Sequence, residues 1–332
     1  MSGVIGHLPN PDVGAAVELA RTAEDHGAGW IGLADAFWWR DVWMLLAKVA
    51  ERTTRIDIGP AMTNPFMRHP FHTASALATL QELAPGRVFC GVAAGGSELT
   101  AAAGVDRRPA ADRVRELVAL LRAVAAGAPL DPTSGRTLEP VLAEVTVLVA
   151  GRGDRMLAAA GACAERVLLW AIPGSDLERS VAVVRAAAAE EGRRPELIWA
   201  PLVRHAGVAE ASLLHVAVYA SINTAAAVRE RWGLGSAEVV AIRRALVAGG
   251  MQAATALVPS AALDDLILDD PTPSAVAATA SPLGITAVAV PGFGTTSLAR
   301  QLRWAAEVEA LLGEAGSGSR GRSLRAGRWP RR

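Results

Sequence analysis

The chain has 332 residues, of which 33 are basic, 33 are acidic and 51% are hydrophobic. This balance gives no general attraction to nucleic acid or to acidic membranes, so neither is expected as a partner. Cys90 and Cys163 show no metal-ligand or redox-pair spacing, so no metal is expected, and isolated thiols suit the reducing cytoplasm. The start lacks the features of a signal peptide and apolar runs are too short to span a bilayer, so we expect a soluble, cytoplasmic protein.

Along the chain, short apolar runs alternate with longer helical patterns. Eight runs have the length and continuous apolar character of parallel strands buried on both faces. They cover residues 4–8, 30–34, 56–60, 88–93, 145–150, 167–171, 197–203 and 287–290. Apolar residues three and four positions apart predict helices over 13–26, 42–52, 71–83, 113–125, 155–163 and 177–191.

About eight strand–helix units in one chain predict an α/β fold, a (β/α)8 TIM barrel, with a doubly wound sheet as the structural alternative. Between Leu213 and Leu268 helix follows helix without a strand, which predicts a helical insertion over about residues 208–270. The last β/α unit then closes with 275–280, 287–290 and 297–312, so residues 1–315 are expected to form a single domain. Residues 127–140 read as a surface loop, and the Arg-rich tail 316–332 as disordered.

The most informative segment reads TRIDIGPAMTNPFMRHPFHTASALATLQELAPGRVFCGVAAGGS, from Thr54 to Ser97. Its pieces IGPAMTNPFMRHP and ATLQELAPGR, with the glycine-rich end that follows, resemble the luciferase-like superfamily. The similarity is closest to the deazaflavin-dependent methylenetetrahydromethanopterin reductases and their actinobacterial relatives. Upstream LARTAEDHGAGWIGLADAF and downstream VLVAGRGDRMLAAAGACAERVLLW extend the resemblance over roughly residues 3–312. It implies a luciferase-like barrel that uses reduced coenzyme F420, with FMN as the alternative cofactor.

The resemblance also implies where the ring of the cofactor lies. Barrel enzymes bind ligands at the C-terminal ends of their strands, and Gly59 to Met62 ends the third strand with small residues suited to a planar ring. A non-prolyl cis peptide is expected at Ala61–Met62, behind the ring, with an ordinary glycine-proline turn as the alternative. The residues expected to form this wall are Pro60, Ala61, Met62, Ala94, Gly95 and Gly96. For the last three, a simple packing role of the glycine run is the alternative.

The sequence AGRGDR over residues 150–155 leaves a strand and opens a helix. Unpaired amides at a helix N-terminus bind phosphate, helped by the helix dipole. In the family the corresponding turn holds the cofactor phosphate, while an ordinary loop is the alternative for this motif. The residues expected in this role are Gly151, Arg152, Gly153, Asp154 and Arg155, with charge from either arginine.

Hydride transfer requires a face-to-face arrangement of ring and acceptor, with a proton donor where the acceptor becomes anionic. Related reductases carry acidic or histidine side chains at several strand ends, where this chain has Gly6, Ala36 and Gly96. Asp35 is retained, so we expect it to contact the cofactor or supply a proton, with a loop or helix-cap acid as the alternative. His7 is a second candidate proton donor, with a structural histidine as the alternative.

The loop after the second predicted strand is unusually aromatic. Phe37, Trp38 and Trp39, with Trp43 shortly after, are expected to form an apolar lid over the ring or a hydrophobic substrate. The alternative is that two of the three tryptophans simply pack onto the barrel. Further along the chain, Asn64, Arg68 and His69 are expected to fix the loop after the third strand and frame the same pocket, without catalysis by His69.

The leading functional hypothesis is that reduced F420 donates a hydride to an activated C=C or C=N bond. The missing acids favour an electrophile that needs little acid help, such as a dehydroamino acid, enone or imine in a small or peptide substrate. Specialised natural-product metabolism fits this departure. The alternatives are an FMN-dependent monooxygenase and a catalytically degenerate, cofactor-binding homologue. A homodimer is expected, because members of the family often dimerise through barrel helices.

Overall fold

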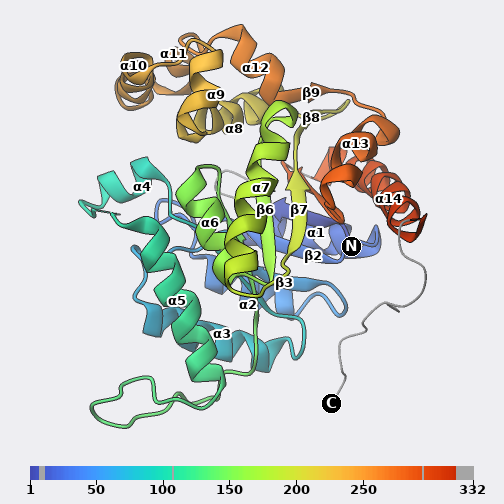
Figure 1. Cartoon of the computed structure of the whole chain (residues 1–332). Helices are drawn as coiled ribbons and strands as arrows, with labels where there is room; N and C mark the ends of the chain where they lie inside the picture. The colour runs from blue at the N-terminus through green and yellow to red at the C-terminus, as the bar shows by residue number, and fades with distance from the viewer. Residues whose placement is uncertain (7–11, 107, 294, 319–332) are drawn as a thin grey trace.

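The structure, a computed structural model, describes residues 1–6, 12–106, 108–293 and 295–318. Eight parallel strands lie in the spatial order β3-β2-β1-β10-β7-β6-β5-β4 (Figure 1). They are β1 (Gly3–Gly6), β2 (Trp30–Leu33), β3 (Asp57–Pro60), β4 (Phe89–Val92), β5 (Thr146–Ala150), β6 (Arg166–Trp170), β7 (Glu196–Ala200) and β10 (Ala287–Gly292). The predicted strands are therefore confirmed to within a few residues.

Strands β3 and β4, at the two ends of this order, meet and close the barrel. The amide of Ile58 donates to the Arg87 carbonyl at 2.7 Å, and the amide of Thr63 donates to the Gly91 carbonyl at 2.9 Å. Isolated parallel bridges join the same segments. The (β/α)8 barrel is thus confirmed, and the doubly wound sheet is wrong.

Helices form the outer layer around these strands. They are α1 (Val13–Asp25), α2 (Val42–Ala50), α3 (Pro70–Leu83), α4 (Ser97–Ala102), α5 (Ala110–Ala125), α6 (Asp154–Cys163), α7 (Gly174–Glu190), α13 (Pro273–Ala280) and α14 (Thr295–Gly318), with a 3-10 turn, η1 (Ser281–Leu283). Their apolar faces pack on the outward side chains of the strands, and Leu19, Leu46 and Leu77 are fully buried there. The sequence pattern did not predict the short α4 or the turn η1. Residues 319–332, most of the predicted tail, lie outside the described residues.

The interior of the barrel changes character along its axis. At the N-terminal end, Arg166 of β6 pairs with Glu196 of β7 at 3.0 Å. Next comes a layer of large side chains, in which Trp30 and Phe89 meet edge to face with ring centroids 5.6 Å apart. At the C-terminal end the inward residues are mainly alanines, namely Ala61, Ala93, Ala150 and Ala200, accompanied by Trp170. The C-terminal end is therefore the part of the interior with least side-chain bulk.

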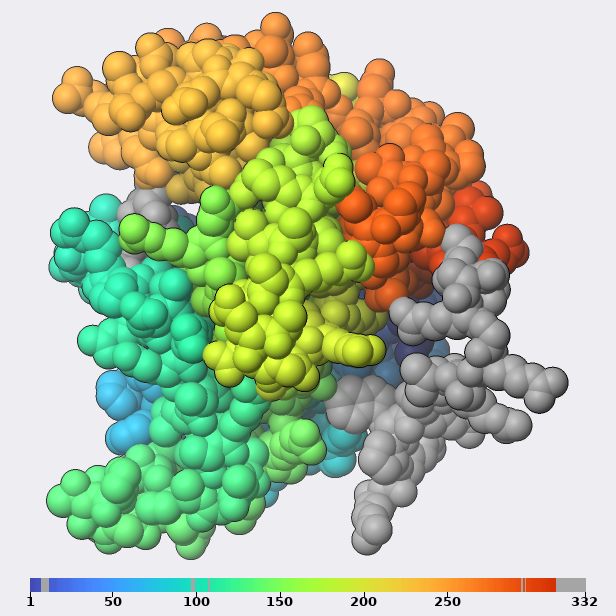
Figure 2. All heavy atoms as spheres, viewed as in Figure 1, coloured from blue at the N-terminus to red at the C-terminus, as the bar shows by residue number. Residues whose placement is uncertain are grey.

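The predicted insertion emerges beyond the C-terminal end of β7, at the top of Figure 1. It begins with β8 (Leu202–Arg204) and returns through β9 (Ile267–Asp269), and the two strands pair in parallel. Between them lie α8 (Glu210–Asn223), α9 (Ala226–Arg231), α10 (Ser236–Ala248), α11 (Gly250–Thr255) and α12 (Ser260–Leu266). These helices share a separate hydrophobic core. In Figure 2 they form a rounded mass at one end, while the loop over 127–140 projects at the opposite end.

Two details of the insertion differ from the sequence prediction. The strand predicted over 197–203 is wrong as one element, because Pro201 has no amide hydrogen and separates β7 from β8. The expectation of helices only between Leu213 and Leu268 is also wrong at its end, where β9 begins at Ile267. No helix among the described residues has both the length and the apolar character needed to cross a membrane.

Candidate active site

The end of β3 departs from regular strand geometry at the place expected from the sequence. The peptide bond between Ala61 and Met62 is cis. The glycines beside it are explained by contacts within the protein. A β-carbon on Gly59 would lie 2.2 Å from the Phe89 carbonyl oxygen, and one on Gly91 would lie 2.2 Å from the Pro60 carbonyl oxygen. The small size of Gly59 is therefore required by the close approach of β3 and β4.

Asp35 follows β2 and is fixed by a neighbour that the sequence analysis did not single out. The fully buried Thr63 donates its hydroxyl hydrogen to Asp35 Oδ2 at 2.7 Å. Burial raises the pKa of the Asp35 carboxyl above its ordinary value, because the ionised form loses hydration, and the Thr63 hydroxyl opposes part of this shift. A partly buried carboxyl with one oxygen held in place is suited to contact a ligand through the other.

The loops after β3 and β4 lie against each other. Asn64 is buried, and its Oδ1 accepts hydrogen bonds from the amides of Phe66 at 3.1 Å and Met67 at 3.0 Å. A β-carbon on Gly95, which has a φ of 72°, would lie 3.2 Å from Asn64 Cγ. Ala61 and Gly95 therefore lie at the same end of the barrel. Ala94 is partly buried, and Gly96 is exposed as the cap of α4.

A pocket of about 460 Å³ opens beside these loops. It is lined by Asp35, Ala36, Phe37, Trp39, Asp41, Met67, Arg68, His69, His72 and Leu99. Five of these were expected at the ligand site from the sequence, namely Asp35, Phe37, Trp39, Arg68 and His69. The sequence analysis missed His72, although it follows His69 by three residues and so lies on the same side of α3.

The aromatic side chains of the predicted lid lie in different environments. Trp38 does not line the pocket: its exposed fraction is 49%, and its ring lies against Phe37 with centroids 4.9 Å apart. Trp43 is buried and packs onto the barrel. Of the loop's aromatic residues, Phe37 and Trp39 line the pocket.

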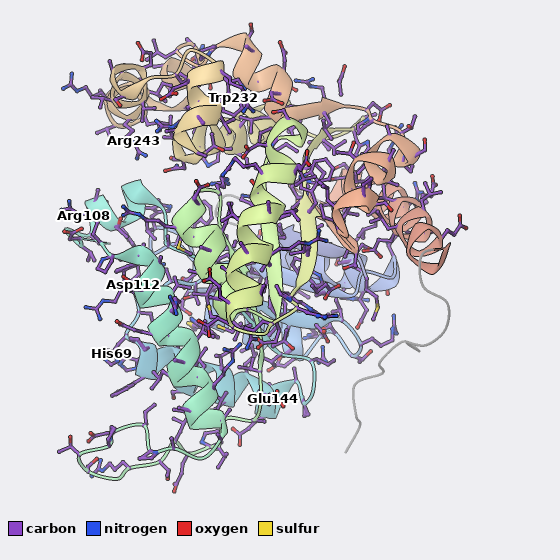
Figure 3. The ribbon with its side chains drawn as sticks, in the orientation of Figure 1. His69, Arg108, Asp112, Glu144, Trp232 and Arg243 are labelled. Atoms are coloured by element: carbon purple, nitrogen blue, oxygen red, sulfur yellow. The ribbon has the colours of Figure 1, made fainter. Side chains whose placement is uncertain are left out.

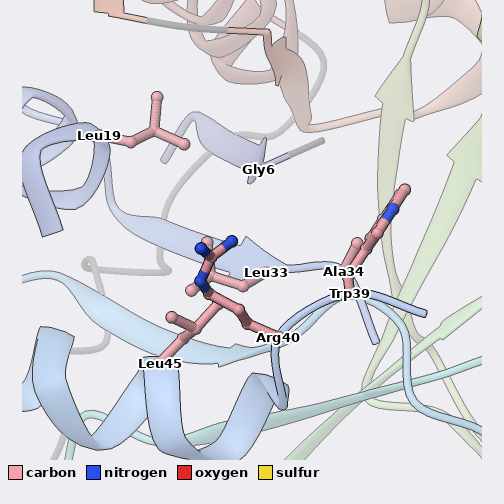
Figure 4. A pocket seen from close by; sticks show the side chains of 7 residues that line it. All are labelled: Gly6, Leu19, Leu33, Ala34, Trp39, Arg40 and Leu45. Atoms are coloured by element: carbon pink, nitrogen blue, oxygen red, sulfur yellow. The ribbon is translucent and has the colours of Figure 1, made fainter. Parts of the chain in front are cut away.

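A much smaller cavity, of about 10 Å³, lies behind the same loop and is shown in Figure 4. It is lined by Gly6, Leu19, Leu33, Ala34, Trp39, Arg40 and Leu45. In Figure 4, the Arg40 side chain rises near Leu33 and Leu45, whereas the Trp39 ring stands well apart from it. This space accommodates at most a single water molecule, so it is not a substrate site.

The rim of the large pocket is held by interactions of its charged and imidazole groups. Arg68 Nη2 pairs with Asp41 Oδ2 at 2.9 Å, and the guanidinium lies 5.6 Å from the centre of the Trp43 ring. His69 Nδ1 accepts a hydrogen bond from the Phe71 amide at 3.2 Å and so caps α3. Figure 3 shows His69 on the outer side of the molecule. These contacts fix the loop that carries both Arg68 and His69.

The turn after β5 has the geometry of an anion site. Helix α6 begins at Asp154, and its cap residue Gly153 offers no side chain to the first amides. A β-carbon on Gly153 would meet no atom within 4 Å, so the space beside this cap is open. Arg155 is exposed and stands in the first turn.

Arg152 lies at this turn and is short of electrostatic partners. Its Nε donates to the Trp170 carbonyl oxygen at 2.9 Å, and among the described residues no carboxylate pairs with it. Burial lowers the pKa of Arg152 to about 10, so the group remains charged at neutral pH. In contrast, Asp154 forms an ion pair with Arg179, which also binds Asp176. A cation without a counter-charge beside open helix amides is suited to a phosphate.

Some predicted residues contribute nothing that the structure describes. His7 lies outside the described residues. The positions where related reductases carry acids or histidine remain without such groups, since Ala36 lines the large pocket and Gly6 the small cavity. Of the residues considered at these strand ends, Asp35 is therefore the acid that can contact a ligand or supply a proton.

Comparisons with known proteins place this geometry in a family. A sequence model described as luciferase-like monooxygenase matches residues 2–280. A 5,10-methylenetetrahydromethanopterin reductase of Methanolobus tindarius is 27% identical over 198 residues, which cover 58% of this chain and 61% of that protein. An F420-dependent glucose-6-phosphate dehydrogenase of Mycolicibacterium gilvum is 29% identical over 205 residues, 54% of this chain and 60% of that protein. The chain thus spans about six tenths of the length of these relatives.

Solved structures show the same fold. The coenzyme F420 dependent tetrahydromethanopterin reductase of Methanopyrus kandleri matches with a TM-score of 0.70 and 22% identity, over 87% of this chain and 92% of that one. A monooxygenase of Streptomyces bottropensis matches with a TM-score of 0.58 and 19% identity, over 92% of this chain and 98% of that one. With most of its length matched by the family model and a barrel of the same architecture, the chain belongs to the luciferase-like monooxygenase family.

Proposed function

We propose that the chain is an F420-dependent reductase that transfers a hydride to an activated C=C or C=N bond. The observation that carries this proposal is the unpaired Arg152 guanidinium beside the open N-terminus of α6. This anion site lies at the same end of the barrel as the cis peptide Ala61–Met62. The names of the relatives support F420 as the cofactor, since several of them are F420-dependent enzymes.

The residues present fit such a cofactor. The C-terminal end of the barrel carries mainly small side chains, and a flat ring would lie there against Ala61, Met62 and Ala94, with Pro60 and Gly95 at its edges. The amides over 153–155 and the charge of Arg152 suit its phosphate, and Gly151 keeps the turn close to α6, where a β-carbon would lie 2.8 Å from Met156. When bound there, reduced F420 supplies the hydride.

The other tasks fall to side chains of this protein. Asp35 is placed to supply a proton, since burial raises the pKa of its carboxyl above the ordinary value, and Thr63 keeps that carboxyl in one orientation. Phe37 and Trp39 cover the pocket and exclude water from it. We further propose that the chain works in the cytoplasm as a homodimer, on a small or peptide-borne substrate in natural-product metabolism.

The test is a titration of the purified full chain with F420 and, separately, with FMN, followed by ring fluorescence. F420 is expected to bind, and Arg152→Met to weaken it about 10- to 100-fold, as expected for lost charged hydrogen bonds. Binding of F420 no better than to an unrelated barrel protein contradicts the proposal.

The family's description and its monooxygenase structures favour one second candidate, an FMN-dependent monooxygenase. It predicts the opposite preference in the same titration. It also predicts oxygen consumption in the presence of reduced FMN, which an oxygen electrode measures directly.

A further inference from the structure

The charges around the large pocket do not balance. Besides imidazoles, the ionisable groups that line it are Asp35, Asp41 and Arg68. Arg68 pairs with Asp41 at 2.9 Å, so these two neutralise each other. Asp35 forms no ion pair among the residues that the structure describes, where its one hydrogen bond comes from Thr63. Arg68 acts on Asp35 from a longer distance, while its own ion pair is with Asp41. The pocket therefore carries one uncompensated carboxyl.

The two imidazoles of the rim are those of His69 and His72. His69 Nδ1 is already engaged, because it accepts the hydrogen of the Phe71 amide. The guanidinium of the rim, that of Arg68, is engaged by Asp41. An anionic ligand would thus meet Asp35 without a free cation to offset it.

The surroundings of Asp35 suit a positively charged ligand instead. An ionised carboxyl in a partly buried site lacks hydration, and a ligand cation beside it restores the lost electrostatic stabilisation. Phe37 and Trp39 line the same pocket, and aromatic faces attract cations, indole most strongly. The carboxyl and the aromatic side chains therefore both favour a cationic ligand.

We propose that the substrate of this pocket carries a basic nitrogen, as an imine whose C=N bond is reduced, with Asp35 as proton donor and counter-ion. This inference rests on the proposed function and narrows its substrate class. The imine nitrogen uses its lone pair to accept the proton of the Asp35 carboxylic acid, which becomes a carboxylate. The imine carbon then accepts the hydride, and the C=N π electrons become the lone pair of the amine nitrogen. Asp35 is restored by the proton that F420H2 releases on oxidation.

Thr63 has a defined part in this scheme as a positioning residue. Its hydroxyl binds Oδ2 and leaves Oδ1 for the substrate nitrogen. Its backbone belongs to the β3–β4 closure, since its amide and carbonyl bond to Gly91 and Ala93. The carboxyl is therefore oriented by a rigid part of the barrel.

The first test measures binding by calorimetry with three probes of equal size, benzylamine, benzyl alcohol and benzoate, on the full chain near neutral pH. Benzylamine is expected to bind about ten-fold more tightly than benzyl alcohol, and benzoate most weakly. Asp35→Asn is expected to abolish the preference for the amine, whereas Asp25→Asn, the same change at the exposed end of α1, retains it. Equal binding of the three probes, or tighter binding of benzoate, overturns the inference.

A measurement on the unaltered protein guards against misfolding of the variant. As the pH is lowered through the pKa of Asp35, the carboxylate is lost, so the preference for benzylamine over benzyl alcohol is expected to vanish. A preference that does not change with pH in this range contradicts the role of Asp35.

The second test supplies F420H2 with a cyclic imine, 3,4-dihydroisoquinoline, or an enone, 2-cyclohexenone. The imine is expected to be reduced about ten-fold faster or more, because Asp35 protonates nitrogen readily. Faster reduction of the enone overturns the inference while leaving the proposed function intact. Failure to bind F420, with the amine preference retained, removes the proposed function and leaves the cation site.

Discussion

At the N-terminal end of the barrel charged side chains are paired, whereas at the C-terminal end two of them lack a partner of opposite charge. Arg166 binds Glu196 at 3.0 Å, and Asp57 lies within the field of Arg166 and Arg87. At the other end, among the described residues, neither Asp35 nor Arg152 forms an ion pair, and the arginine that acts on Asp35, Arg68, is itself paired with Asp41. The two ends also differ in bulk, with large rings near one and alanines at the other.

This difference separates charges that serve folding from charges held for a ligand. A paired charge recovers by attraction part of the hydration that it loses on burial, while an unpaired one does not. Keeping two unpaired charges at the same end costs stability, so that end is where a ligand of complementary charge is expected to bind. The following variants test whether the division is real.

The largest expected effect comes from adding one carbon where β3 and β4 meet. In Gly59→Ala the new β-carbon would lie 2.2 Å from the Phe89 carbonyl oxygen, so the backbone must shift. We expect a loss of about 3 kcal/mol in the free energy of unfolding, measured with urea. Gly174→Ala is the control, because its β-carbon meets nothing within 4 Å. Equal stability of both variants would show that the close approach is not a constraint.

Two arginine variants, one at each end of the barrel, allow a direct comparison of the effects on F420 binding and on stability. Arg152→Met is expected to weaken F420 binding about 10- to 100-fold and to leave stability unchanged or higher, because an unpaired cation is removed. Arg166→Met is expected to cost about 1–2 kcal/mol of stability, because Glu196 loses its partner, with F420 affinity unchanged. Fluorescence titration and urea unfolding measure both quantities. If both variants changed the same quantity, the comparison of the two ends would fail.

A smaller effect is expected at the rim of the pocket. His69→Ala removes the acceptor for the Phe71 amide and is expected to cost about 1 kcal/mol, as for other N-cap losses. His69→Asn supplies a new cap acceptor and is expected to recover most of this in chemical denaturation. A full loss in both variants would mean that His69 acts through packing against Phe71 instead.

The smallest effect concerns the dependence of stability on pH. The folded-state pKa of Asp35 is raised, so the folded protein binds its proton more readily than the unfolded chain does. Its contribution is therefore fully present in acid and is lost as the pH rises through the folded-state pKa. Asp35→Asn lacks this loss, so it is expected to exceed the wild type by less than about 1 kcal/mol at neutral pH and to match it in acid. Free energies of unfolding of both proteins, measured from acid to neutral pH, test whether the variant is the more stable one at neutral pH.

Most of the fold follows from local pattern, and its exceptions depend on distant contacts. The eight barrel strands are buried on both faces, so each shows as an apolar run in the sequence. Strand β9 has three residues and exists because it pairs with β8, about sixty positions earlier, so no local pattern marks it. The break at Pro201 was visible in the sequence, since proline cannot donate to a strand ladder, but the apolar run around it obscured the signal.

The candidate site is predictable in part for the same reason. Motifs within one loop, such as the cis bond at Ala61 and the turn at Arg152, follow from a resemblance in sequence. The bond from Thr63 to Asp35 joins residues 28 positions apart, so it required the barrel to be assembled. Whether Arg152 has an ion-pair partner likewise depends on contacts between distant segments, so the sequence around it cannot predict this.

The pairing of β8 with β9 has a consequence for how such proteins diverge. The chain leaves the barrel and comes back to it through adjacent strands whose register joins Leu202 to Ile267, and the helices between them have their own core. A connection spanning a three-residue strand, roughly 10 Å, is enough to bridge Arg204 to Ile267. Recombination across this junction can exchange the whole helical lobe while the barrel is inherited unchanged.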